Sequence, residues 1–279
     1  MYKPRLERPS GGLVGNHSSV GTEVAVYVAC STRCFASMPL ENALRMINEL
    51  QFSKVDVAIQ ENGSHLKPSE VAQDVSLAAQ KIRIGPSLTP SSFHVQFDTA
   101  DETTYQEQLK AICRLARLSA ITTITISASP VETPMATEVA RLKRLVNIAQ
   151  TEGIILSLAT HNGTLTENPK TAVELCREVP SLGITLDPSH YLIGPHQSES
   201  FDCVFPYVRH VHFRDTGRSA EQFQVRIGQG QVEYGRIVSS LIRLKYDRLL
   251  TVDIHDIPDS PFVMESEVRK LKYLLESLI

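Results

Sequence analysis

The sequence has no stretch approaching the ~18 consecutive apolar residues that a membrane-spanning helix needs. Residues 1–23 lack the apolar segment of a secretory signal and are rich in glycine, serine and proline, so we expect a poorly ordered N-terminal extension. The five cysteines show no CxxC spacing, which argues against zinc-knuckle and thioredoxin-type motifs. Unpaired cysteines in a chain without a secretory signal predict a cytoplasmic protein that does not contact membranes.

A surplus of basic residues is also missing. The chain has 28 Lys+Arg against 31 Asp+Glu, and its longest basic cluster is RLKR at 141–144, which is typical of a solvated helix face. This balance predicts no nucleic-acid partner. The sequence has neither the GxGxxG of a dinucleotide-binding turn nor a phosphate-binding P-loop, which argues against a Rossmann fold.

What the chain does contain is a regular alternation of apolar β-type runs with amphipathic helical segments. Such alternation predicts a parallel sheet, and eight repeats predict a closed (β/α)8 TIM barrel as one domain over 24–279. The expected strands are 24–31, 54–59, 82–88, 121–128, 154–160, 182–187, 209–215 and 248–254. The expected helices are 39–52, 68–81, 103–120, 137–153, 168–179, 200–208, 234–246 and 266–279.

Polar side chains gather where four of the later strands end. Asp187, His212 and Asp253 end three consecutive strands, and His161 follows the strand before them. Because active sites of such barrels form at the carboxyl ends of the strands, these residues predict one site. Two carboxylates and an imidazole suit Mn²⁺, Mg²⁺, Co²⁺ or Zn²⁺. We expect His210 to point away from this site, toward the helices or solvent.

Several short motifs resemble those of one enzyme family. The segments LDPSH (186–190), VHFRD (211–215) and RIGQG (226–230), with the acid of the last strand, are similar to the sugar phosphate isomerase/epimerase superfamily, the xylose isomerase-like TIM barrels. The resemblance implies a divalent metal held by Glu, Asp, His and Glu on strands five to eight. In that family the metal binds neighbouring oxygens of a sugar-like hydroxy-ketone, and the two glutamates move protons.

The resemblance implies metal ligands at Asp187, His212 and Asp253. The glutamate of strand five falls on Ala159, which has no ligand atom, so His161 becomes the expected substitute. Because one carboxylate is missing and Asp253 is shorter than glutamate, a divalent metal (Mn, Mg, Co or Zn) is expected to be weakly held or absent.

Candidate catalytic and substrate-binding residues follow from the same comparison. Asp253, His161 and His190 are the expected bases, and His190 also matches a substrate contact. Arg218 follows strand seven, where relatives place an arginine on substrate oxygens. His65 and His94 are expected in loops after strands two and three, at the rim of the site.

The predicted function is a metal-dependent isomerase, epimerase or related lyase acting on a small sugar-like polyhydroxylated carbonyl compound. The alternative, motivated by Ala159, is a catalytically impaired barrel that binds a sugar as a sensor or partner subunit. A nuclease resembling endonuclease IV is disfavoured because Gln222 and Gln224 stand where that chemistry needs Asp and His. Barrels of this family often self-associate, which leaves a homo-oligomer open.

Overall fold

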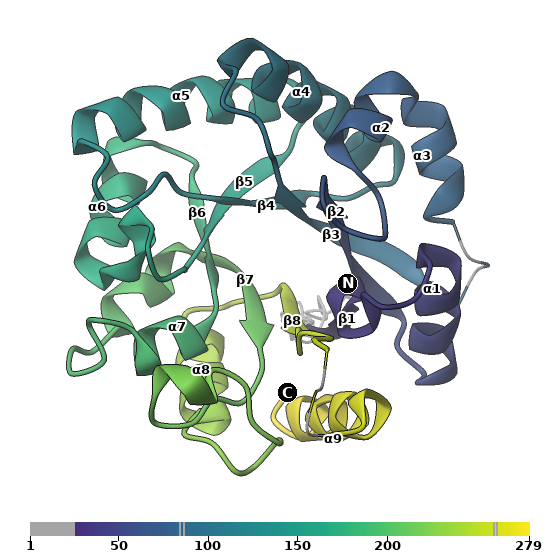
Figure 1. Cartoon of the computed structure of the whole chain (residues 1–279). Coiled ribbons are helices and arrows are strands. Elements are labelled where there is room, and N and C mark those ends of the chain that lie inside the picture. Colours follow the sequence, from purple (N-terminus) through teal and green to yellow (C-terminus); the bar gives the residue numbers. More distant parts are fainter. Residues whose placement is uncertain (1–25, 84, 86, 259, 261) are drawn as a thin grey trace, which may run out of the picture.

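Eight parallel strands close into a barrel in chain order, with β1 paired to both β2 and β8 (Figure 1). The computed structural model describes residues 26–83, 85, 87–258, 260 and 262–279, and the extension expected at 1–23 lies outside them. The predicted (β/α)8 architecture is confirmed. The strands are β1 (Tyr27–Ser31), β2 (Lys54–Gln60), β3 (Thr89–Gln96), β4 (Thr123–Ser127), β5 (Ile155–Ala159), β6 (Gly183–Leu186), β7 (Val208–Phe213) and β8 (Leu249–Val252).

Helices surround the strands on the outside of the barrel (Figure 1). No helix among the described residues is long and apolar enough to cross a membrane. The α-helices are α1 (Leu40–Glu49), α2 (Pro68–Gln73), α3 (Val75–Lys81), α4 (Glu102–Leu118), α5 (Met135–Thr151), α6 (Pro169–Glu178), α7 (Pro188–Ile193), α8 (Tyr234–Arg243) and α9 (Met264–Glu276). Short 3₁₀ helices are η1 (Thr32–Phe35), η2 (Leu165–Glu167), η3 (Asp202–Tyr207) and η4 (Ala220–Gln222).

Three predicted elements differ from the structure. The strand expected at 82–88 is wrong, because Gly85 has a left-handed backbone (φ 52°) and β3 begins only at Thr89. The helix expected at 68–81 divides into α2 and α3 at Asp74, whose extended backbone ends one helix and whose side chain caps the next. The helix expected at 200–208 is the 3₁₀ helix η3, which contains a proline.

The barrel interior is polar, whereas the layer between strands and helices is apolar. On β2, Asp56 faces the interior, and its neighbours Val55 and Val57 belong to the apolar core. Hydroxyl groups on three other strands form a buried chain: Thr125 and Thr185 lie 2.8 Å apart, and Thr185 donates to Ser157 at 2.9 Å. These three hydroxyl groups inside the barrel are therefore paired with one another, as burial requires.

The loop between β7 and α8 is organised by one buried carboxylate. Asp215 accepts hydrogen bonds from the backbone N–H groups of Thr216, Gly228, Gly230 and Val232 at 2.8 to 3.4 Å. A Cβ atom at Gly230 would lie 2.1 Å from this carboxylate, so glycine is required there. Asp215 therefore braces the loop that follows the strand-seven end of the barrel.

Replacing Asp215 with alanine should lower the free energy of unfolding by about 3 kcal/mol, because buried N–H groups lose their acceptor. Urea unfolding followed by circular dichroism measures the change. Asp247→Ala is the control, since that side chain is 63% exposed, and its effect should stay within about 0.5 kcal/mol. Equal losses in the two variants would contradict the bracing role.

Candidate active site

A cavity of about 180 Å³ opens at the carboxyl ends of the strands. Its lining combines imidazoles and guanidiniums with one carboxylate and several hydroxyl groups. The charged and imidazole-bearing residues among them are Arg33, His94, His161, Asp187, His190, His212, Arg214 and His255. The structure thus brings His94, His161, Asp187, His190 and His212 together, five of the residues chosen from the sequence.

At the bottom of the site, one imidazole lies between two carboxylates. His212 lies between Asp56, 3.0 Å from its Nε2, and Asp253, 3.5 Å from its Nδ1. Ser92 donates to the other oxygen of Asp56 at 2.7 Å. Burial alone would raise the pKa of Asp56. The hydrogen bond from His212 and the neighbouring imidazoles lower it by a larger amount, so the pKa of Asp56 is below its usual value. Asp56 is therefore an ionised carboxylate that orients His212.

His210 shares this interior face, and the expectation that it points outward is wrong. Its ring lies 4.5 Å from that of His212, and its Nε2 lies 2.7 Å from the hydroxyl of Thr251. Residues two positions apart on a strand project to the same face, which explains the placement. Burial lowers the pKa of His210 to about 3, so its ring is neutral at pH 7.

His94 also differs from its expected loop position. It lies on β3 with its ring facing the interior, 5.3 Å from the ring of His212. Burial and the positive charge of Arg33 hold the pKa of His94 well below its usual range. Its Nδ1 has no hydrogen-bond partner among the described residues.

Two arginines that the sequence analysis missed hold the strand-end carboxylates. Arg33, in the 3₁₀ helix after β1, binds Asp253 through both Nε and Nη2, with Nε 3.0 Å from Oδ1. Arg214, directly after β7, donates from Nη2 to Asp187. Arg214 follows His212 by two positions, so strand alternation was the signal that could have found it. Arg33 had no comparable signal, because the chain leaves the strand at that point.

The positions at which the sequence resemblance implies metal ligands do not fit a divalent ion in this chain. Ala159 offers no ligand atom. Asp187 accepts Ser189 on Oδ1 and Arg214 on Oδ2, and both oxygens of Asp253 are held by Arg33. The carboxylate oxygens that a metal would need therefore already accept hydrogen bonds from Ser189, Arg214 or Arg33.

A second group lies deeper in the barrel. One ligand atom from each of Asp56, His210 and His212 lies within 4.8 Å of the others, which is close enough to hold a metal ion. Two of those residues already hydrogen-bond to each other, through Nε2 of His212 and Oδ2 of Asp56.

Two adjacent histidines at the rim are fixed in opposite tautomers by one residue. The Nδ1 of His161 lies 2.6 Å from the carbonyl oxygen of Asn162, and the N–H of Asn162 donates to Nδ1 of His190 at 3.2 Å. A carbonyl only accepts and an N–H only donates, so neutral His161 keeps its lone pair on Nε2, while neutral His190 carries its proton on Nε2. The two rings lie 4.4 Å apart.

Both rings are neutral at pH 7. Burial lowers the pKa of His161, and it holds the pKa of His190 well below its usual range. The rim thus presents a proton acceptor beside a proton donor. Such a pair can remove a proton from one atom of a bound molecule and deliver one to another.

Two residues expected to contact substrate lie elsewhere. His65 places its ring nitrogens 3.1 Å from the Thr32 hydroxyl and 3.2 Å from the Met38 carbonyl, outside the cavity lining. Arg218 is exposed, and its backbone N–H donates to the side chain of Gln222. His255, which the sequence analysis left without a role, does line the cavity, where Gln224 holds its backbone with two hydrogen bonds.

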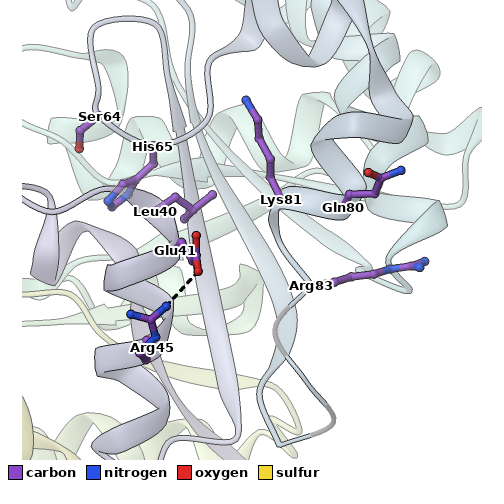
Figure 2. A pocket seen from close by; sticks show the side chains of 8 residues that line it. All are labelled: Leu40, Glu41, Arg45, Ser64, His65, Gln80, Lys81 and Arg83. Carbon is purple, nitrogen blue, oxygen red and sulfur yellow. Dashed lines mark hydrogen bonds and ion pairs between the residues drawn. The ribbon is translucent and has the colours of Figure 1, made fainter.

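A separate hollow of about 480 Å³ lies outside the barrel between α1 and α3 (Figure 2). Arg45 is paired with Glu41 on the same helix, and Lys81 and Arg83 point in different directions (Figure 2). Its cationic groups do not converge, so the strand-end cavity remains the candidate site.

Comparisons with known proteins identify the family of this barrel. Residues 44–274 match the family described as xylose isomerase-like TIM barrel. An uncharacterized protein of Methanocaldococcus jannaschii is 25% identical over 137 residues, which are 46% of this chain and 46% of that protein.

Solved structures share the fold at low identity. A D-allulose 3-epimerase from Methylomonas sp. is 15% identical with a TM-score of 0.68, covering 92% of this chain and 99% of that one. A xylose isomerase-like TIM barrel protein from Mycobacterium smegmatis, solved in complex with magnesium, is 18% identical with a TM-score of 0.66, covering 91% and 98%. The family match spans most of the sequence and the barrel is closed, so the chain belongs to the xylose isomerase-like TIM barrel family.

Proposed function

We propose that this protein moves a proton next to the carbonyl group of a small polyhydroxylated compound, as a sugar isomerase or a related epimerase or lyase. The observation that carries the proposal is the pair of opposite tautomers on His161 and His190. A site that only binds a sugar needs hydrogen bonds, but it does not need a proton acceptor and a proton donor fixed side by side.

In the proposed reaction, Nε2 of His161 takes the proton from the carbon beside the carbonyl. The electrons of that C–H bond move into the carbonyl group, whose oxygen gains negative charge. The N–H of His190 donates to this oxygen, and the nearby guanidinium of Arg214 favours the charge. His161 then returns its proton to the former carbonyl carbon, and the former carbonyl oxygen keeps the proton that His190 donated. The adjacent hydroxyl gives its proton to His190 and becomes the new carbonyl, which completes an isomerisation.

Ala159 favours a one-base reaction over a symmetric epimerisation. Inverting a carbon requires a proton acceptor on one face and a proton donor on the other. Ala159 supplies neither at the position where the family has glutamate. An isomerase can work with a single base, because the same group takes and returns the proton on one face. A lyase that expels a neighbouring hydroxyl group needs the same first step.

The size and polarity of the cavity support a small, hydroxyl-rich substrate. At about 180 Å³ it lies below the ~300–1,000 Å³ typical of pockets for drug-sized ligands. The side chains of Gln96, Ser127 and Thr164 add polar groups to its lining. The structural likeness to a D-allulose 3-epimerase agrees with a sugar-like compound. The divalent metal implied by the sequence resemblance has no part in this proposal, because its expected ligands at the rim do not fit an ion.

Replacing His161 with alanine should slow proton exchange by about 10²–10⁴-fold, because the base is lost. The measurement is deuterium uptake from D₂O at the carbon beside the carbonyl of D-allulose and other ketoses, followed by NMR. His196→Ala is the control, since that ring pairs with Glu199 outside the cavity lining, and it should exchange at the wild-type rate. Thermal stabilisation by a ketose with no exchange in the wild type would instead support a binding-only barrel.

The exchange rate should fall at acidic pH with a midpoint below 6.5. Burial lowers the pKa of His161 from its usual 6.5, so the lone pair on Nε2 is available above that lowered pKa and lost as the pH falls through it. A profile of kcat/KM against pH reports this group in the free enzyme. A midpoint above 6.5 would assign the base to another group.

A further inference from the structure

We propose that the guanidinium groups of Arg33 and Arg214 take the place of the divalent metal, so that this barrel binds its ligand without a metal ion. That arginines replace the metal can be tested without any activity, whereas the effect of this replacement on catalysis rests on the proposed function. The carboxylates concerned are Asp187 and Asp253, the metal ligands expected from the sequence resemblance.

Arg33 binds Asp253 through two nitrogens at once. The paired nitrogens are Nε and Nη2, one to each carboxylate oxygen, which is the geometry in which arginine binds carboxylates best. Asp253 is fully buried, while the Arg33 side chain is 15% exposed and lines the cavity. Its remaining nitrogen, Nη1, has no hydrogen-bond partner in the described part of the chain and is free to bind a ligand oxygen.

Arg214 is fixed from several sides. It donates from Nη2 to Asp187, its Nη1 lies 3.1 Å from Nε2 of His255, and its guanidinium carbon lies 4.4 Å from the ring centre of Phe223. Its Nη2 is also 3.9 Å from Asp253, so the two ion pairs adjoin. Burial lowers the pKa of Arg214 to about 10, which still leaves it positively charged at neutral pH.

The charges of the rim balance without an ion. Asp187 and Asp253 contribute two negative charges, and Arg33 and Arg214 contribute two positive charges, the same charge that one divalent ion would bring. Binding an ion at this place would require breaking both buried ion pairs. Removing the partner of a buried charge is strongly unfavourable, so the arginines exclude the metal.

Guanidinium groups can perform part of a metal's task. They stay protonated and present several N–H donors in a plane, which suits two neighbouring oxygens of a hydroxy-carbonyl compound. They differ from a metal in that they do not lower the pKa of a bound hydroxyl by direct coordination. The neutral imidazoles of His161 and His190 would then perform the proton transfers.

The test begins with the metal content of the purified wild-type protein, measured by mass spectrometry without prior use of chelators. We expect far less than one equivalent of any divalent metal, and no rise in melting temperature with Mn²⁺, Co²⁺ or Zn²⁺. A stoichiometric ion would overturn the proposal, whether it sits at the rim or on Asp56, His210 and His212.

Removing the arginines should restore metal binding. The variant Arg33→Ala/Arg214→Ala frees both carboxylates, so Mn²⁺ should raise its melting temperature while leaving that of the wild type unchanged. The matched control is Arg236→Ala, which removes an arginine that pairs with Asp202 and Glu233 on the surface. An identical Mn²⁺ response in the double variant and the wild type would overturn the replacement. If the double variant does not fold, the wild-type metal content decides alone.

Deuterium exchange in the presence of EDTA separates this inference from the proposed function. Exchange at an unchanged rate is expected, and loss of exchange that Mn²⁺ restores would overturn the metal replacement while leaving proton transfer intact. No exchange with any ketose, with or without EDTA, would remove the proposed function, and the metal content would still test the role of the arginines.

Discussion

Burial of carboxylates within and at the ends of the strands is the constraint on which the rest of the site depends. Asp56, Asp187 and Asp253 are all at most 4% exposed, and ionised groups at such positions require compensating charge or hydrogen bonds. Arg33 and Arg214 supply that compensation for two of them, and His212 with Ser92 supplies it for the third. The positions of the cationic groups, and so the shape of the cavity between them, follow from this requirement.

Near these ion pairs, the backbone of Asn162 fixes the tautomers of the two rim imidazoles, His161 and His190. Its carbonyl accepts from Nδ1 of His161 and its N–H donates to Nδ1 of His190, so the proton of His161 is on Nδ1 and that of His190 is on Nε2. Burial keeps both rings neutral, so the difference between acceptor and donor is preserved at pH 7. Which ring accepts a proton and which donates one thus depends on hydrogen bonds to the backbone as much as on residue type.

The sequence predicted the barrel, and with it which polar residues meet at the strand ends, because both depend on periodic patterns. Strand-end polarity located Asp187, His212 and Asp253, since parallel strands bring their carboxyl ends to one rim. His94 was misplaced because a strand was predicted over 82–88, before β3. The ion pairs of Arg33 and Arg214 depend on side-chain geometry between distant elements, which no local pattern encodes. Nor does residue order show which nitrogen of His161 carries its proton, because a backbone contact fixes it.

The most direct test is a crystal grown in the presence of Mn²⁺ and a ketose, with an anomalous difference map calculated around the strand ends. The account predicts no anomalous peak between Asp187 and Asp253, with the guanidinium groups in place and ligand oxygens within hydrogen-bond distance of Arg33 or Arg214. A strong peak between those carboxylates, with either arginine displaced, would contradict it.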